Sequence, residues 1–335
     1  MTKRTIKLFL GALLAASAYS PAAAQLNSAE LKARIAALQE AIDGKGAAWI
    51  AGETDISGLS EKDWKYLVGL NFEPVDAPPL PEFSMTEVPV SFDWRDNEGN
   101  FVTPARNQKK CGSCWAFAMT GALESYGLLQ KGTPGVDLDL SEQVMLSCSG
   151  AGSCNGGRLT ASYLQRTGLP GEEVYPYTAT DGSCSAAGEG WQAGAQKIGG
   201  WGSVTRSIEK MKAALLKYGP LPTAMYVYED FMHYKSGVYS YVEGKRLGGH
   251  AVLLVGYNDA EGYFIVKNSW DKGWGEDGFF RIAYSEVAGK SYFGMSTIAY
   301  WPKAGKDGYG APEAHLHKAD ETFGRVAPML ETGWK

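Results

Sequence analysis

The segment that most constrains the fold of this chain is 107–117, with the sequence NQKKCGSCWAF. Its second cysteine, Cys114, is followed at long range by a histidine and an asparagine in equally distinctive settings. His250 lies in the run GGHAVLLVGY, and Asn268 lies in the run KNSWDKGWG. A thiol, an imidazole and a carboxamide are suited to act as a nucleophile, its base and the group that orients the base. A fold that uses them must bring together residues that are far apart in the sequence.

The N-terminal end of this 335-residue chain has the order of a secretory signal peptide. Residues 1–24 contain a basic start, an apolar stretch over 6–18 and three alanines at 22–24 as a cleavage site. We expect cleavage before Gln25. The apolar stretch is too short for a comfortable membrane span, and no later run approaches about 20 apolar residues. The mature protein is therefore expected to be soluble and secreted, without a membrane partner: extracellular, periplasmic in a bacterium, or on the lysosomal or vacuolar route in a eukaryote.

Composition disfavours several classes of ligand. The formal net charge of −5 and the pI near 5.5 give no polybasic patch, which argues against nucleic acid as a partner. No GxxxxGK element is present for a nucleotide, and no cofactor is expected. Residues 303–335 are polar and without periodicity, which indicates a flexible extension. His315 and His317 in this extension could bind a metal, but an isolated His-x-His in a polar tail usually does not, and no metal site is assigned.

The number of cysteines also carries information. Export to an oxidising compartment makes disulfides expected, yet the chain has five cysteines, so one must stay unpaired. The odd cysteine could be a leftover buried thiol that behaves as a small apolar side chain. The setting of Cys114 favours a reactive thiol instead.

Two sequence patterns follow the predicted signal peptide. Leu31, Ile35, Leu38 and Ile42 recur at helical spacing, which predicts one amphipathic helix with Asn27 as a possible cap. A proline-rich link over 74–89 is then expected to be exposed and extended.

The remainder changes from helical to β patterning near residue 195. A mostly buried helix is predicted from Cys114 to near Gly132, and a second helix over 140–146 with Ser141 as its cap. Short aromatic and β-branched runs divided by glycine then predict strands at 219–228, 237–241, 250–257, 263–267 and 278–283.

Taken together, the Cys, His and Asn segments resemble the papain/cathepsin family of cysteine proteases. The resemblance covers about residues 88–302 and implies an α+β, papain-like two-domain fold, with a left helical domain (about 88–195), a right antiparallel β-barrel-like domain (about 196–302) and the cleft between them. Residues 88–95, VPVSFDWR, look like the start of a mature enzyme of this family. Residues 25–87 are therefore interpreted as a short propeptide; the alternative is an ordinary helical subdomain.

The resemblance assigns roles that elementary chemistry supports. The pKa of a thiol falls when the cysteine lies at a helix N-terminus beside an imidazolium, so Cys114 and His250 could form a thiolate–imidazolium pair. Asn268 would hold the second ring nitrogen of His250, and Trp270 would cover that hydrogen bond. Gln108 would donate to the oxyanion beside the backbone N–H of Cys114. The expected activity is that of a cysteine endopeptidase acting on peptides and proteins and made as a secreted zymogen.

Substrate-binding residues are likewise implied by the resemblance. Gly156 and Gly157 would pair with the backbone of an extended substrate. The pocket for the side chain two residues before the cut would be lined by Arg158, Leu159, Ala224, Ala251 and Ile298. Trp270 and Trp274 would line the leaving-group side. Arg158 replaces a common aromatic residue, and Gly249 replaces the acidic residue common before the histidine.

Mostly apolar walls predict a preference for Leu, Val or Phe over Arg at that substrate position. Nothing resembles the additional His-bearing loop that makes cathepsin B-like enzymes remove dipeptides. His233, in a polar neighbourhood, is expected at the surface rather than as a second base. Expected partners are the chain's own propeptide and cystatin-like inhibitors, and the protein is expected to be a monomer.

The resemblance also implies that Cys111 pairs with Cys154 and Cys148 with Cys184. A further bridge common in the second domain is missing, because Gly248 and Phe293 occupy its positions.

Three alternatives remain from the sequence. Cys111 and Cys114 form a CxxC at a helix start, as in thiol–disulfide oxidoreductases, which would require the two to bridge each other. A catalytically silent binding relative would normally have lost the cysteine or the histidine. A peptidoglycan-cutting Cys–His hydrolase would leave Gln108 and the segment 267–278 unexplained.

Overall fold

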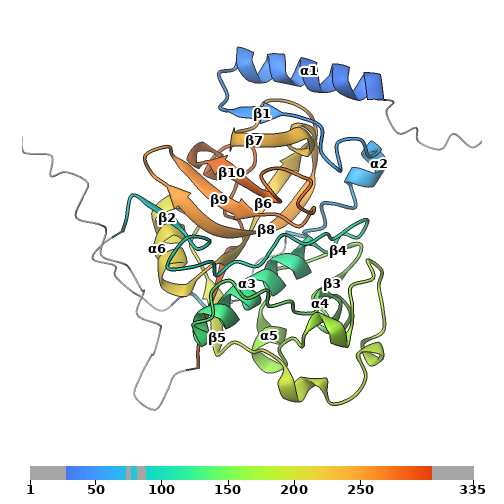
Figure 1. The fold of residues 1–335 in the computed structure, drawn as a ribbon, viewed down its shortest axis with the longest axis vertical. Coiled ribbons are helices and arrows are strands. Elements are labelled where there is room, and N and C mark those ends of the chain that lie inside the picture. Colours follow the sequence, from blue (N-terminus) through green and yellow to red (C-terminus); the bar gives the residue numbers. More distant parts are fainter. Residues whose placement is uncertain (1–27, 73–76, 81–87, 304–335) are drawn as a thin grey trace, which may run out of the picture.

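The computed structural model describes residues 28–72, 77–80 and 88–303, and Figure 1 shows a β half above a helical half. The predicted signal peptide, Asn27 and the extension beyond Lys303 lie outside these described residues. Among the described residues, no helix is both long enough and apolar enough to cross a membrane.

Helix α3 (Cys114–Lys131) is the central element of the helical half. Every residue from Cys114 to Leu128 is buried, so this helix exposes side chains only in its last turn. The helix ends at Gly132, which has a left-handed backbone (φ 60°) and whose N–H caps the carbonyls of Leu128 and Leu129. The predicted buried helix from Cys114 to Gly132 is confirmed.

Shorter elements complete this half. Helix α4 (Glu142–Cys148) begins after Ser141, whose hydroxyl accepts a hydrogen bond from the Val144 N–H, as the predicted serine cap requires. The others are β3 (Gly152–Ser153), β4 (Gly156–Gly157), α5 (Ser162–Arg166), and the short 3₁₀ helices η1 (Glu172–Val174), η2 (Cys184–Ala187) and η3 (Trp191–Gly194).

Two disulfides tie these elements together. Cys111 is bonded to Cys154, and Cys148 is bonded to Cys184, which are the pairs implied by the resemblance. Cys114 is the free cysteine and is buried. Since Cys111 is already bonded elsewhere, it does not bridge Cys114 in this structure.

The β half is built on a curled, mainly antiparallel sheet. Its strands follow the order β1-β7-β10-β9-β8-β2, β6 pairs with β8 off this path, and only β10 and β7 pair in parallel. The strands are β1 (Trp49–Ala51), β2 (Ser91–Asp93), β6 (Leu221–Tyr228), β7 (Tyr234–Tyr239), β8 (Arg246–Asn258), β9 (Tyr263–Lys267) and β10 (Phe279–Ala283). Helix α6 (Ile208–Tyr218), η4 (Glu229–His233), η5 (Tyr284–Val287) and the pair β5 (Gly200–Ser203) and β11 (Ile298–Trp301) accompany it.

Strand β8 is longer than the predicted 250–257. It begins at Arg246 because Gly248 and Gly249, which suggested a break, continue the pairing with β6 opposite Val227 and Tyr226. Residues 91–93 were assigned to the mainly helical half, without a predicted strand, and they form β2, which pairs with β8 of the β half.

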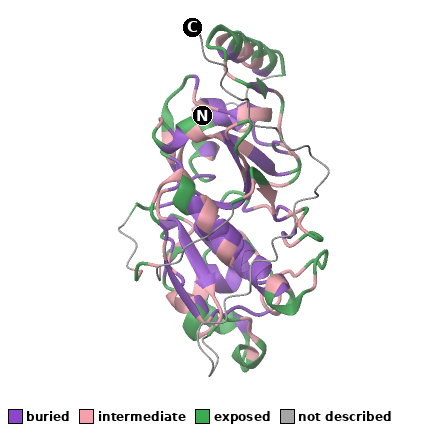
Figure 2. Cartoon of the chain, turned by 90° about the vertical axis from the view of Figure 1, so that its left-hand side faces the viewer, coloured by how far each residue is buried: buried purple, intermediate pink, exposed green. Residues whose placement is uncertain are grey.

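The two halves share one core. Figure 2 shows buried residues concentrated in the long helix and in the strands that face it. Helix α3 packs against β8, and at Gly121 an added Cβ would meet Leu253 at 3.4 Å and the Lys267 ammonium at 3.5 Å. This contact fixes the N-terminus of α3 relative to the middle of β8.

The N-terminal segment, defined here as residues 28–72, packs on the β half. Helix α1 (Ser28–Gly44) forms where the helix was predicted and buries Leu31, Leu38 and Ile42. Strand β1 adds to the sheet edge by antiparallel pairing with β7, and the short helix α2 (Glu61–Trp64) follows. The chain then enters the space between the two halves.

The predicted proline-rich link is only partly described. Residues 77–80 are exposed or half-buried, as expected, but they are not free, because the Ser203 N–H donates to the Pro78 carbonyl at 2.9 Å and Pro79 bridges Ser203 in parallel.

Candidate active site

Cys114 is the first residue of α3, so its thiol lies at the helix N-terminus, where the helix dipole is positive. Its sulfur accepts a hydrogen bond from the Ala251 N–H of β8 at 3.4 Å, which links the two halves at this point. The side chain is fully buried. The packing of α3 on β8 therefore places the thiol next to the strand that carries His250.

His250 is held by the two residues predicted to accompany it. Its Nε2 lies 2.7 Å from Asn268 Oδ1, which also accepts the Ser269 N–H at 2.8 Å. The indole of Trp270 stacks on the imidazole with ring centroids 4.7 Å apart. The other ring nitrogen, Nδ1, has no hydrogen-bond partner among the described residues, so it is the one left for the thiol.

Gln108 is fully buried, and its carboxamide is fixed at both ends. Its Oε1 accepts from the Ser269 hydroxyl at 2.7 Å, while Nε2 donates to the Cys111 carbonyl at 2.9 Å and to the Leu67 carbonyl at 3.3 Å. The Trp270 indole N–H donates to the same Leu67 oxygen at 3.3 Å. A backbone carbonyl of the N-terminal segment thus occupies the donors of Gln108 and Trp270.

The N-terminal segment fills the cleft as an added strand. The Gly157 N–H donates to the Gly69 carbonyl at 2.9 Å, the Asn71 N–H donates to the Gly157 carbonyl at 2.8 Å, and the Leu70 N–H donates to the Gly249 carbonyl at 2.9 Å. Leu70 pairs in parallel with Gly157 and antiparallel with Gly249. The segment is therefore bonded to both halves, directly over Cys114.

This burial changes the ionisation of the pair. Burial raises the pKa of the Cys114 thiol to about 11, although the N–H groups of Ala251 and Gly69 oppose the rise. Burial also lowers the pKa of His250 to about 4 despite its bond to Asn268. Burial thus opposes the thiolate–imidazolium pair expected from the sequence in this closed arrangement.

Most residues of the predicted substrate pocket lie together. Ala224 and Ala251 face each other across the β6–β8 ladder, and Gly156 and Gly157 form β4 beside the covering strand. Leu159, Ala224, Ala251 and Ile298 are buried, so the walls are apolar, whereas Arg158 is exposed.

Trp274 is fully buried in an aromatic cluster in this arrangement, where residues 67–71 fill the cleft, and its ring centroid lies 5.0 Å from those of both Trp270 and Phe231. One predicted position is wrong. His233 is not at the surface but is 1% exposed, because α2 and the loop before it cover η4.

Two elements of the site were missed by sequence reasoning. Ser269 holds Gln108. It lies inside the run KNSWDKGWG, in which roles were predicted only for Asn268, Trp270 and Trp274. Residues 67–71 gave only a weak signal, a glycine between the apolar residues Val68 and Leu70. The described part of the chain contains no group of three or more His, Cys, Asp or Glu side chains placed to hold a metal ion.

The fold is α+β, and a helix of one half and a strand of the other carry the thiol and the imidazole. Together the fold and this site define a class of protein. Residues 88–300 match the model of the papain family cysteine proteases. The chain belongs to this family.

Relatives and solved structures agree with that assignment. The chain is 40% identical over 206 residues to pro-cathepsin H of Mus musculus, covering 58% of this chain and 60% of that protein. It is 35% identical over 299 residues to cathepsin B-like CP3 of Giardia intestinalis, covering 83% and 93%. Its fold matches digestive procathepsin L2 proteinase of Tenebrio molitor larval midgut with a TM-score of 0.68 at 28% identity, covering 83% and 95%. The recombinant stem bromelain precursor gives a TM-score of 0.68 at 27% identity, covering 82% and 90%.

Proposed function

We propose that this chain is the secreted precursor of a cysteine endopeptidase, with residues 25–87 as the propeptide and 88–302 as the peptidase domain. The observation that carries the proposal is the arrangement of Cys114, His250 and Asn268, with a strand of residues 67–71 laid over it. The thiol is bonded to the N–H of the residue after His250, the imidazole is oriented by Asn268, and a strand of the chain itself is bonded to both sides of the cleft.

The proposed peptide hydrolysis follows from the positions of Cys114 and His250. When the covering strand leaves, water reaches both groups, and the α3 N-terminus favours the Cys114 thiolate with a protonated His250. The thiolate sulfur bonds to the carbonyl carbon of the peptide. As the C–N bond breaks, His250 gives its proton to the leaving amine. A water molecule, deprotonated by His250, then displaces the sulfur and releases the acid.

The negative oxygen of the tetrahedral intermediate needs donors already in place. Gln108 Nε2 and the backbone N–H of Cys114 are suited to this role, since Gln108 Nε2 already donates to the Leu67 carbonyl in the closed arrangement. Removing one such donor typically costs about a hundredfold or more in rate.

The covering strand is proposed to act as an inhibitor rather than as a substrate. Its Gly69 N–H lies towards the Cys114 sulfur. Its bonds to Gly157 and Gly249 imitate a bound peptide, so an extended substrate in the uncovered cleft would use the same backbone groups of β4 and β8.

We expect an apolar side chain at the second substrate position before the cut. The walls formed by Leu159, Ala224, Ala251 and Ile298 are buried and apolar, and Arg158 stands exposed at the edge. A positional peptide library should favour Leu, Val or Phe over Arg there, and a library in which Arg is favoured would contradict this assignment.

The remaining proposals concern the cellular setting. Residues 1–24 are proposed as the signal for secretion. The peptidase domain is proposed to act as a monomer, with cystatin-like inhibitors as partners able to reach the uncovered cleft.

The test is to incubate the full chain in mild reductant with an epoxide thiol trap and to measure intact mass, with Cys114→Ala as control. One adduct on Cys114 in a product that begins near Val88 supports the proposal. Failure of the reduced chain to form any adduct or to cut a peptide library would refute it. Isolation of a Cys111–Cys114 bridge would support an oxidoreductase instead, against the Cys111–Cys154 bond of the structure.

A further inference from the structure

His233, at the end of η4, is buried without a hydrogen bond to its ring. The side chain is 1% exposed, and neither Nδ1 nor Nε2 has a partner among the described residues. Buried polar groups in proteins nearly always have a partner, so such an imidazole requires a physical explanation. It takes no part in the proposed reaction.

The N-terminal segment supplies the cover of this histidine. The indole of Trp64 in α2 meets the imidazole edge to face, with ring centroids 5.6 Å apart at 81°. The Gly52 N–H donates to the His233 carbonyl at 2.8 Å. Arg34 and Leu38 of α1 line a cavity of about 50 Å³ that His233 also borders. Departure of residues 28–72 would therefore expose the ring to water.

The charged groups around the cavity do not compensate a proton on His233. They are Arg34 from α1, Glu229 and Asp230 from η4, and Glu243 from the loop after β7. The Asp230 carboxylate is already occupied by the Tyr239 hydroxyl and by two backbone N–H groups, those of Val242 and Glu243. Glu229 accepts the Lys245 N–H, and Arg34 pairs with Glu61 at 3.4 Å.

We propose that His233 is a pH-sensitive contact between the peptidase domain and its propeptide, so that protonation of its imidazole opposes docking of the N-terminal segment. The proposal rests on the proposed role of residues 25–87 as an inhibitory propeptide. In the docked state a protonated ring has no acceptor and lies near the Arg34 guanidinium. In the released state water solvates it.

The size of the effect follows from the two states. Burial, and to a lesser extent the charge of Arg34, lowers the pKa of His233 to about 4 in the docked state. An exposed histidine has a pKa of about 6.5. The released state then gains a proton as the pH falls below about 6.5, and this proton alone should weaken docking roughly thirtyfold at pH 5 relative to pH 8.

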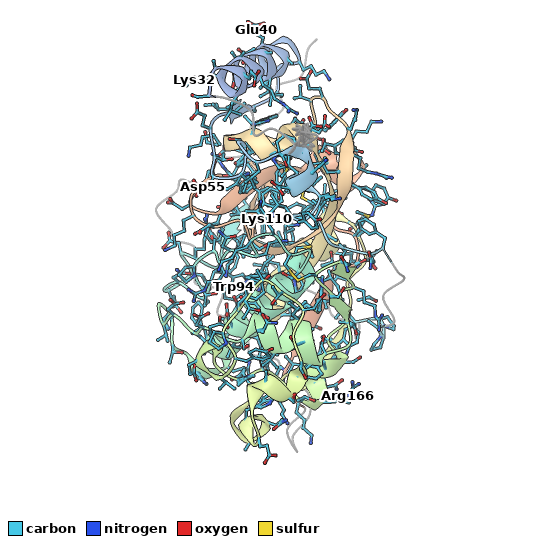
Figure 3. The ribbon with its side chains drawn as sticks, turned by 90° about the vertical axis from the view of Figure 1, so that its right-hand side faces the viewer. Lys32, Glu40, Asp55, Trp94, Lys110 and Arg166 are labelled. Atoms are coloured by element: carbon cyan, nitrogen blue, oxygen red, sulfur yellow. A yellow bond between two sulfur atoms is a disulfide. The ribbon has the colours of Figure 1, made fainter. Side chains whose placement is uncertain are left out.

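Three other groups that the N-terminal segment contains, contacts or covers also titrate, namely Asp63, Asp230 and His250. Lys110 pairs with Asp63 of α2 at 3.2 Å and lies between the helices of the N-terminal segment and the helical half (Figure 3). The pKa of Asp63 is lowered from 3.8 by its bonds to Lys110 and Ser60, which outweigh a desolvation that raises it, so this pair weakens only below about pH 4. Burial raises the pKa of Asp230 to about 6, and if release exposes it, its titration acts in the opposite direction. Burial lowers the pKa of His250 to about 4 under the same covering segment, so His250 also opposes docking between pH 6.5 and 4. Its contribution is present in the parent and in the His233 variants alike, so the difference between them measures His233.

The experiment uses the full chain carrying Cys114→Ala, which cannot process itself. Hydrogen–deuterium exchange of residues 49–72 is measured at pH 8 and pH 5, each corrected for the exchange rate of unstructured peptides. The parent should lose about thirtyfold more protection at pH 5 than His233→Phe and His233→Gln do, because the other titrating groups are the same in all three proteins. Asp63→Asn is the matched control, and it should behave as the parent does.

An equal loss of protection in the parent and in both His233 variants would overturn the proposal, as would no loss in the parent. If one His233 variant fails to fold, the other decides the question. Because the protein is inactive throughout, this outcome is independent of the thiol-trap experiment that tests the proposed function.

Discussion

Gly69 is the residue at which the closed arrangement can be opened by a single methyl group. A Cβ added there would overlap the backbone carbonyl of Gly112, which cannot move away as a flexible side chain could. Gly112 is itself held, because its N–H donates to the Cys154 carbonyl at 2.8 Å. In Gly69→Ala the strand over Cys114 must therefore lift out of the cleft.

Lifting the strand breaks the three backbone hydrogen bonds that join Gly69, Leu70 and Asn71 to Gly157 and Gly249. At a net value of about 0.5–1.5 kcal/mol each, the docked state loses about 1.5–4.5 kcal/mol. Since 1.4 kcal/mol corresponds to a factor of ten, the uncovered population should rise roughly tenfold to a thousandfold.

The assay is the rate at which an epoxide thiol trap labels Cys114 in freshly reduced, unprocessed full chain at neutral pH. The matched control is Gly58→Ala in the same segment, where an added Cβ meets only Leu31 Cδ2 at 3.8 Å, an ordinary contact. Gly69→Ala should be labelled at least about tenfold faster than Gly58→Ala. Equal rates for the two variants would refute the argument that residues 67–71 guard the thiol.

Three further changes have defined outcomes. Ser269→Ala removes the hydroxyl that holds Gln108, so kcat of the processed enzyme should fall about fivefold with KM nearly unchanged, and a change confined to KM would contradict this. Loss of the Cys148–Cys184 bond, which closes a separation of 36 residues, should lower the free energy of unfolding by about 3–4 kcal/mol in urea titrations of the Cys114→Ala chain. Burial raises the pKa of Glu172 to about 7. Its contribution to the free energy of unfolding is therefore present below about pH 4.5 and is lost as the pH rises towards 7. The free energy of unfolding of Glu172→Gln should change less between pH 5 and pH 8 than that of the parent.

Local patterns explain why the helical half could be predicted. Helix α3 was marked by closely spaced apolar residues ending at a glycine, and α4 by the Ser141 cap, and both signals act within a few residues. The motif residues Cys114, His250 and Asn268 could be recognised for the same reason, since each lies in a distinctive short run.

Features that depend on distant contacts could not be predicted. His233 has polar neighbours in the sequence, yet it is buried by Trp64 and Gly52 from the N-terminal segment. The packing of Trp274 on Phe231 also joins residues that are far apart in the sequence. The start of β8 at Arg246 likewise depends on the partner strand β6, which overrides the glycines.

The covering strand explains both how the site is blocked and why it is inert while blocked. The same residues that close the cleft keep water from Cys114 and His250, and burial opposes charge on each of them. A rare opening too small to admit a peptide would still leave the thiol neutral and slow to attack. Activation therefore requires water to reach the pair as well as removal of a steric block. For this reason a contact such as His233, remote from the thiol but covered by the same segment, can influence when the nucleophile becomes reactive.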